Sequence, residues 1–268
     1  MRVIFEILLL LMFTSTIYGQ EADSNSFIHS YASAILIKLQ QYNELCNSKI
    51  DAIFKTLNGE TYVFKGDKFW RLTSEGIAPG YPRLIATHWG GQLPNNIDAA
   101  FTWRYKDGLE DTFIFKEDLY WQYKNSTTPF VFNSEEVQQG KEEKKRYNNT
   151  ISDGFPGVPN SISSAFFLGG KTYFTKGDDL WIYEYMEDTD TDRVSKKSLS
   201  KSWQGFPDNI PNIEATIRST YSQFYLFKNG EYFLMENTGN DEFRVVEASP
   251  SFPRNAGEWW FGCGKFLN

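Results

Sequence analysis

A pattern of about 50 residues occurs four times along this chain. The first copy, Ile50 to Leu72, reads as a short apolar run, a turn at Asn58-Gly59, an aromatic run, a turn at Lys65-Gly66-Asp67 and another aromatic run. The copies start at Ile50, Ile97, Ile162 and Ile213. Repeats of this length with several strand-like runs indicate a β-propeller in which each repeat is one blade. We therefore predict an all-β fold with blades at about 50–96, 97–161, 162–212 and 213–263.

The side chains of each repeat fit specific places in a blade. The first run carries small residues, which suit an innermost strand because the blades crowd together at the axis. These runs are Asp51-Ala52-Ile53, Asp98-Ala99-Ala100, Ser163-Ser164-Ala165 and Glu214-Ala215-Thr216. The next two runs alternate large rings with polar residues, and the rings are expected to fill the space between blades. Asn58-Gly59 and Gly169-Gly170 predict tight hairpins between the first two strands, and Asp107-Gly108 marks a longer turn.

The N-terminal residues predict a secretory signal peptide over 1–19. Arg2 gives a minimal basic start, Val3 to Phe13 is apolar, and a short polar end stops at the small residue Gly19. A buried N-terminal helix is the alternative. Residues 20–45 form a leader that is partly helical, which either packs on the domain or docks on a partner. Residues 264–268 form a C-terminal tail.

The second repeat holds an insertion at about 125–150. It carries the two glycosylation sequons, at Asn125 and Asn148, and the charged run Glu142 to Arg146. An insertion of this kind in a compact domain is a surface excursion, and N-glycans would keep it solvated. Sequons this short also occur by chance, so occupancy and vacancy both remain open.

Charge and motifs exclude several functions. The net charge is −7 without a dense basic patch, so we expect no nucleic-acid partner. After the signal peptide, no apolar run is long enough to cross a bilayer, so we expect no membrane insertion. His29 and His88 are the two histidines, and neither belongs to a His-Glu-x-x-His zinc motif. We therefore predict that the chain is not an enzyme.

The residues of the first repeats resemble a known family. The Asp-Ala starts, the turn Phe64-Lys65-Gly66-Asp67 and the following Trp70 resemble hemopexin repeats. Such repeats occur in serum hemopexin, vitronectin and the C-terminal domains of matrix metalloproteinases. The resemblance covers about Cys46 to Cys263, is strong in the first two repeats and is weaker in the fourth. It implies a single four-bladed propeller over residues 46–263.

The resemblance also implies a disulfide and a bound ion. The two cysteines, Cys46 and Cys263, stand where that family has its ring-closing disulfide. In the resembling metalloproteinase domains, backbone carbonyls near each Asp-Ala pair bind an axial ion. The corresponding positions here are Asp51, Asp98, Ser163 and Glu214, whose main-chain oxygens would suit a structural Ca²⁺ or Na⁺. A water-filled channel is the alternative.

These inferences predict a secreted, extracellular, non-catalytic module that binds extracellular proteins or matrix components. Contacts are expected near Trp89, Trp203 and Trp259-Trp260, although packing explains these residues equally well. One alternative is a small-molecule carrier for heme, a polyamine or another ligand. The other is a metalloproteinase-related modulator of extracellular proteolysis. We expect no heme binding, because the resembling transporter holds heme between two propellers on histidine ligands and this chain has one propeller.

Overall fold

The computed structural model divides the chain into two compact units, 1–44 and 45–268. It describes Ser30, Ser33, 44–46, 49–56, 58–89, 93–105, 108–124, 148–186, 189–205 and 213–263. The predicted signal peptide, nearly all of the predicted leader, the C-terminal tail, Asn125 and His29 lie outside these residues. Within the described part of the chain, no helix is both long enough and apolar enough to cross a membrane.

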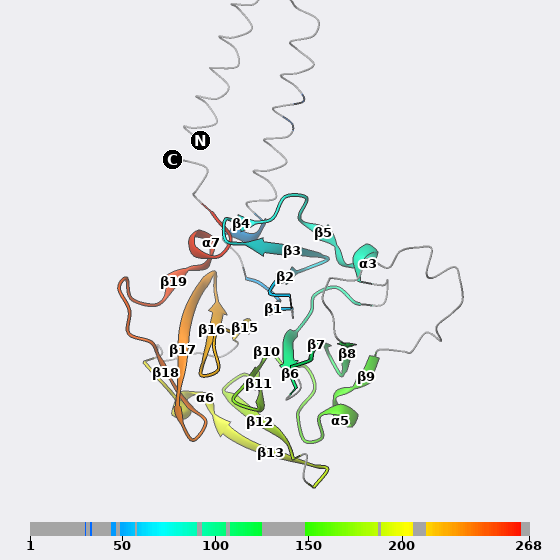
Figure 1. Ribbon diagram of the computed structural model, residues 1–268, viewed down its shortest axis with the longest axis vertical. Helices are drawn as coiled ribbons and strands as arrows, with labels where there is room; N and C mark the ends of the chain where they lie inside the picture. Colours follow the sequence, from blue (N-terminus) through cyan, green and yellow to red (C-terminus); the bar gives the residue numbers. More distant parts are fainter. Residues whose placement is uncertain are drawn as a thin grey trace, which may run out of the picture. The chain divides into compact units, whose positions relative to one another are not determined.

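The described strands of the second unit form four sheets, and each sheet is built on the first three strands of one repeat (Figure 1). Blade 1 has β1 (Ala52–Lys55), β2 (Thr61–Lys65), β3 (Lys68–Thr73), β4 (Gly76–Ile77) and β5 (Arg83–Leu84). Blade 2 has β6 (Ala99–Arg104), β7 (Glu110–Lys116), β8 (Leu119–Lys124) and β9 (Asn148–Thr150). Blade 3 has β10 (Ser164–Leu168), β11 (Lys171–Lys176), β12 (Asp179–Met186) and β13 (Thr191–Ser198). Blade 4 has β14 (Trp203–Gln204), β15 (Ala215–Arg218), β16 (Gln223–Lys228), β17 (Glu231–Gly239), β18 (Glu242–Val245) and β19 (Arg254–Asn255).

The first strands of the four repeats form a closed ring. β1 contacts both β6 and β15, and β10 contacts the same two strands. Each first strand pairs antiparallel with the second strand of its own repeat, and that strand pairs with the third. The blades therefore follow one another in sequence order around an axis lined by β1, β6, β10 and β15. This arrangement confirms the predicted four-bladed propeller.

Aromatic rings fill the space between neighbouring blades, as the alternating pattern predicts. Phe155, at the end of blade 2, packs edge-on against Phe174 of blade 3 with ring centroids 5.2 Å apart. Phe166 of blade 3 stacks on Phe224 of blade 4 at 4.0 Å. Ring pairs of this kind contribute about 0.5–1.5 kcal/mol beyond the burial of their area. At the axis, Ala99 and other small residues allow the inner strands to approach one another.

A one-turn helix follows the outer part of each blade. The helices are α3 (Ile85–His88), α5 (Ile151–Gly154), α6 (Leu199–Ser202) and α7 (Ala256–Trp259). The first N–H of each helix donates to a carbonyl in the turn between the second and third strands of the same blade, at 2.8–2.9 Å. Each helix is thereby fixed to the turn that it covers, which explains why the pattern recurs in all four blades.

Two features correct details of the sequence-based prediction. The insertion in blade 2 ends before Asn148, because Asn148–Thr150 is strand β9, paired with β8. The Asn58-Gly59 turn is not a two-residue hairpin. Thr56 and Glu60 close a longer loop there through a 2.9 Å hydrogen bond from the Thr56 N–H to the Glu60 carbonyl. The turn at Gly169-Gly170 is a two-residue connection with both φ angles positive, as predicted.

Blade 4 also contains a strand that the repeat pattern does not contain. β14, which follows α6 at the end of the third repeat, pairs in parallel with β18 of blade 4. The pairing joins Trp203 with Phe243 and Gln204 with Arg244. The end of the third repeat is therefore joined to blade 4 by backbone hydrogen bonds in addition to packed side chains.

A disulfide closes the seam, the place where blade 4 meets blade 1. Cys46 and Cys263 are bonded, with their Cα atoms 5.8 Å apart and 217 residues between them in sequence. Gly76 of β4 lies against the same end of the chain. A Cβ built at Gly76 would stand 2.7 Å from the carbonyl oxygen of Phe261, so only glycine fits there, and its φ of +115° also favours glycine. The predicted ring-closing disulfide is confirmed.

Candidate functional site

The four predicted ion-binding residues occupy equivalent places at one end of the inner strands. The backbone N–H of each residue donates to a carbonyl near the end of the second strand of its blade. The donors and acceptors are Asp51 to Phe64, Asp98 to Phe115, Ser163 to Thr175 and Glu214 to Phe227, at 2.7–3.1 Å. The four residues therefore share one register at the start of the axial channel, which we call the channel entrance.

Three of the four side chains at the channel entrance also cap a turn of their own blade. Asp51 Oδ2 accepts the Gly66 N–H at 2.7 Å, and Asp98 Oδ2 accepts the Glu117 N–H at 2.6 Å. In blade 4, Glu214 Oε1 accepts the Asn229 N–H at 3.0 Å.

Blade 3 replaces the carboxylate with a shorter side chain. Ser163 Oγ donates to the carbonyl of Thr175 on its own blade at 3.1 Å.

The capping role of Asp51, Asp98 and Glu214 was not predicted from the sequence. The available signal was an acidic residue 15 to 19 positions before a turn residue in three of the repeats.

Burial raises the pKa of two carboxyl groups at the channel entrance. It raises the pKa of Asp51, and the nearby Asp98 carboxylate acts in the same direction, against the hydrogen bond from Gly66 and the charges of two lysines. Burial likewise raises the pKa of Glu214. The Oε2 atom of Glu214 is buried, and among the described residues no donor forms a hydrogen bond with it. These hard oxygen donors suit Ca²⁺ or Na⁺ better than a soft metal, so the residues fit the expected ion, which stays a prediction.

No group of three or more His, Cys, Asp or Glu side chains in the described residues is arranged to hold a metal. His88 lies on the last turn of α3, where its Nδ1 is 2.7 Å from Thr87 Oγ1 and its ring packs against Phe69. His88 therefore has a packing role in blade 1. Asn148 begins the outermost strand of blade 2, and the presence of glycans at Asn125 and Asn148 stays a prediction.

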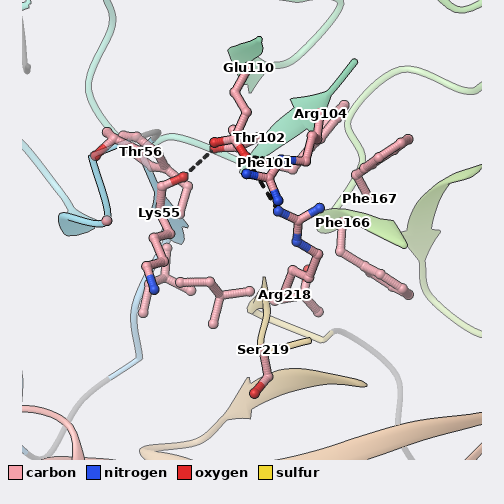
Figure 2. A pocket seen from close by; sticks show the side chains of 15 residues that line it. Lys55, Thr56, Phe101, Thr102, Arg104, Glu110, Phe166, Phe167, Arg218 and Ser219 are labelled. Atoms are coloured by element: carbon pink, nitrogen blue, oxygen red, sulfur yellow. Dashed lines mark hydrogen bonds and ion pairs between the residues drawn. The ribbon is translucent and has the colours of Figure 1, made fainter. Parts of the chain in front are cut away.

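The opposite end of the channel opens into a pocket of about 240 Å³, which we call the channel pocket. All four inner strands contribute to it, and its charged side chains are Lys55, Arg104, Glu110 and Arg218 (Figure 2). Glu110 is 5% exposed, and its Oε1 lies 3.0 Å from Arg104 Nε and 3.5 Å from Arg218 Nη2. The two guanidinium groups therefore share one carboxylate oxygen. Sequence reasoning did not identify these residues.

The tryptophans expected to make contacts fall into two groups. Trp89 and Trp203 are buried at the ends of α3 and α6. Trp89 packs between blades 1 and 2 against Tyr123, and Trp203 packs against Phe224 of blade 4. Of the two alternatives for these residues, packing is therefore the one that the structure supports, because the one-turn helices direct both rings inward.

Trp260 ends α7 in the same way as Trp89 ends α3, and its ring packs on Phe227 at 5.1 Å. Trp259 differs, because 52% of its surface is exposed. The Arg254 guanidinium lies 4.8 Å from the Trp259 ring and 4.3 Å from the Phe252 ring. We call Phe252, Arg254 and Trp259 the rim surface of blade 4.

Comparison with known proteins agrees with this architecture. The model of the family described as Hemopexin matches residues 50–92. Rabbit (Oryctolagus cuniculus) vitronectin is 31% identical over 171 residues, which cover 61% of this chain and 32% of vitronectin. Matrix metalloproteinase-21 of Xenopus laevis is 28% identical over 215 residues, covering 75% of this chain and 33% of the enzyme.

The chain thus spans about a third of the length of these curated relatives. Among solved structures, a hemopexin-fold protein from cow pea superposes with a TM-score of 0.57 and 19% identity, over 80% of this chain and 96% of that one. At this identity, the likeness concerns the fold alone. The fourfold repeat, the closed ring of blades with its disulfide, the match to the Hemopexin model over the first repeat and the similarity to vitronectin and the metalloproteinases support the resemblance of this chain to the hemopexin-like repeat family.

Proposed function

We propose that this chain is a secreted, non-catalytic module whose propeller binds extracellular proteins or matrix components. Its relatives include vitronectin and matrix metalloproteinases, and the disulfide is typical of proteins that fold in an oxidising compartment. Paired strands hold the propeller rigid, so that surface loops and rim residues are free to vary for recognition. A hard cation at the channel entrance would have a structural role in this proposal.

The exposure of Trp259 is the observation that supports binding through the rim surface. Trp89 and Trp203 end their blades as buried packing residues, whereas blade 4 adds a second, exposed ring beside Trp260. Trp and Arg are the residue types that most often dominate binding energy at protein interfaces. Here a tryptophan, an arginine and a phenylalanine already lie in contact, so little side-chain freedom would be lost when a partner binds.

Binding of the purified, full-length chain to an immobilised extracellular-matrix extract tests this proposal. We expect Trp259→Ala to weaken binding by roughly 30-fold, the effect of losing one dominant interface residue. Tyr221→Ala is the matched control, because Tyr221 is 76% exposed but lies outside the rim surface. Melting temperatures would verify that both variants fold. Equal binding by wild type and Trp259→Ala, or no binding by the wild type, would contradict the proposal.

A further inference from the structure

The channel pocket concentrates positive charge within an acidic protein. Its lining includes three basic side chains, Lys55, Arg104 and Arg218, and one carboxylate, Glu110, so its formal charge is +3 − 1 = +2. The chain as a whole has a net charge of −7. A concave site lined mostly by one sign of charge focuses its field on the opening and attracts ions of the opposite sign. The site is therefore suited to an anion.

The two arginines are neutralised only in part by the carboxylate between them. Both approach the same Oε1 of Glu110, and Figure 2 shows their side chains converging on one region of the pocket. One carboxylate charge cannot balance two guanidinium charges. The Arg104 and Arg218 side chains remain 39% and 26% exposed, so their other N–H groups are within reach of a ligand. Guanidinium N–H groups are spaced to bind carboxylate or phosphate oxygens in pairs.

Two hydroxyl groups of the pocket already donate to backbone carbonyls. Thr102 Oγ1 donates to the carbonyl of Lys55 at 2.6 Å, and Thr216 Oγ1 donates to the carbonyl of Ala165 at 2.8 Å. These bonds join inner strands that are neighbours around the axis, β6 with β1 and β15 with β10. They hold the walls of the pocket in place, and the two arginines and Lys55 supply the charged donors of the lining.

The volume limits the size of the ligand. About 240 Å³ lies below the range of roughly 300–1,000 Å³ that is typical of pockets for drug-sized ligands, so heme would not fit inside. We propose that the channel pocket binds a small multivalent oxyanion, either inorganic phosphate or a short dicarboxylate, between Arg104 and Arg218. The positive lining disfavours a polyamine. This proposal is independent of protein binding at the rim surface.

Isothermal titration of the full-length chain at constant ionic strength tests the site with three probes: inorganic phosphate, succinate and spermidine. We expect saturable binding of phosphate or succinate and weaker or no binding of spermidine. Whichever of the two anions binds more tightly identifies the chemical source of the ligand. Binding of neither anion, or tighter binding of spermidine, would overturn the proposal.

Three variants locate the site and separate binding from folding. Arg218→Ala should weaken anion binding roughly 10- to 100-fold, the effect of losing one hydrogen bond to a charged group. Glu110→Gln should instead tighten it, because the competing negative charge is lost, and a merely misfolded variant would not show this gain. Arg244→Ala, which removes a guanidinium paired with Glu236 outside the pocket, should bind as wild type does. Equal losses in Arg218→Ala and Arg244→Ala, or weaker binding by Glu110→Gln, would refute the assignment.

Discussion

The Asp51 side chain has a structural role that is separate from its position on the axis. Its carboxylate accepts the N–H of Gly66 and so caps the turn between β2 and β3, and Asp98 and Glu214 repeat this arrangement in two other blades. The resemblance to hemopexin repeats implied a role only for the backbone carbonyl of Asp51, as a ligand of an axial ion. The structure shows that the side chain stabilises its own blade while its charge is held in a partly buried place, where burial raises its pKa.

Substitutions at Asp51 should separate the hydrogen bond from the charge. Asp51→Ala removes the acceptor for Gly66 and should lower the free energy of unfolding by about 1 kcal/mol at pH 7. Asp51→Asn keeps an acceptor oxygen and removes the charge, so it should be at least as stable as wild type in the presence of EDTA. Urea unfolding of the three proteins measures both effects. Equal destabilisation by Asn and Ala would contradict the capping role.

The comparison of wild type with Asp51→Asn also predicts how the stability difference between them changes with pH. Because burial raises the folded-state pKa of Asp51 above its ordinary value of 3.8, the stability that this carboxyl contributes is fully present below pH 3.8. That stability is lost as the pH rises through the folded-state pKa. The advantage of wild type over Asp51→Asn should therefore be greatest at about pH 3.5 and smallest at pH 7. An advantage that grows with pH would show that the sign is wrong.

At the scale of single elements, the four one-turn helices are held by their surroundings. A four-residue helix is too short to be stable alone. The start of each helix is held in place because its first N–H donates to a carbonyl in the turn between the second and third strands of the same blade. Two of the helices also have side-chain caps: the Asp153 N–H donates to Thr150 Oγ1, and the Glu258 N–H donates to Asn255 Oδ1.

Thr150 belongs both to the α5 cap and to the sequon of Asn148, and variants can separate the two roles. In protein made without glycosylation, Thr150→Ala should lower the free energy of unfolding by about 1 kcal/mol, while Thr150→Ser should have little effect. Asn148→Gln removes the sequon and leaves the Thr150 cap in place, so it serves as the control. Chemical denaturation measures all three. Equal stability of Thr150→Ala and wild type would show that the cap is dispensable.

The fold could be predicted from the repeats in the sequence. Features that form between residues far apart in the chain could not. The period and the alternating rings predicted the inner strands and the interblade core. Strand β14 escaped because it pairs with β18, about 40 residues away, rather than with a neighbour in the chain. The channel pocket escaped because Arg104 and Glu110 meet Arg218 only after the ring has closed. The exposure of Trp259 depends on the direction of α7, which local spacing does not encode.

At the scale of the whole propeller, the seam differs from the junction between blades 3 and 4. There, the parallel strand β14 adds backbone hydrogen bonds to side-chain packing. At the seam, the disulfide of Cys46 and Cys263 provides a covalent connection, and β4 meets the end of the chain at Gly76. Closing a loop of 217 residues removes about 5 kcal/mol of unfolded-chain entropy in the usual loop model.

Removal of the disulfide should therefore lower the melting temperature markedly. Loss of a native disulfide typically costs about 2–5 kcal/mol, and at about 2–4 °C per kcal/mol the expected decrease for Cys263→Ser is on the order of 10 °C. Scanning calorimetry measures it, and a Cys46→Ser/Cys263→Ser double variant controls for effects of a free thiol. Unchanged melting after reduction, or titration of two free thiols in the native protein, would contradict ring closure by this bond.

The pairing of β8 with β9 has a consequence for engineering. Trp121 on β8 is paired with Asn148 on β9, so β8, which ends at Lys124, and β9, which begins at Asn148, are neighbouring strands of a single sheet. The entropy of closing a loop changes by only about 0.6 kcal/mol for each doubling of its length. The segment between β8 and β9 is therefore a natural insertion cassette: a shorter linker, an affinity tag or a foreign recognition loop can replace it while the ring of blades and its disulfide keep their register.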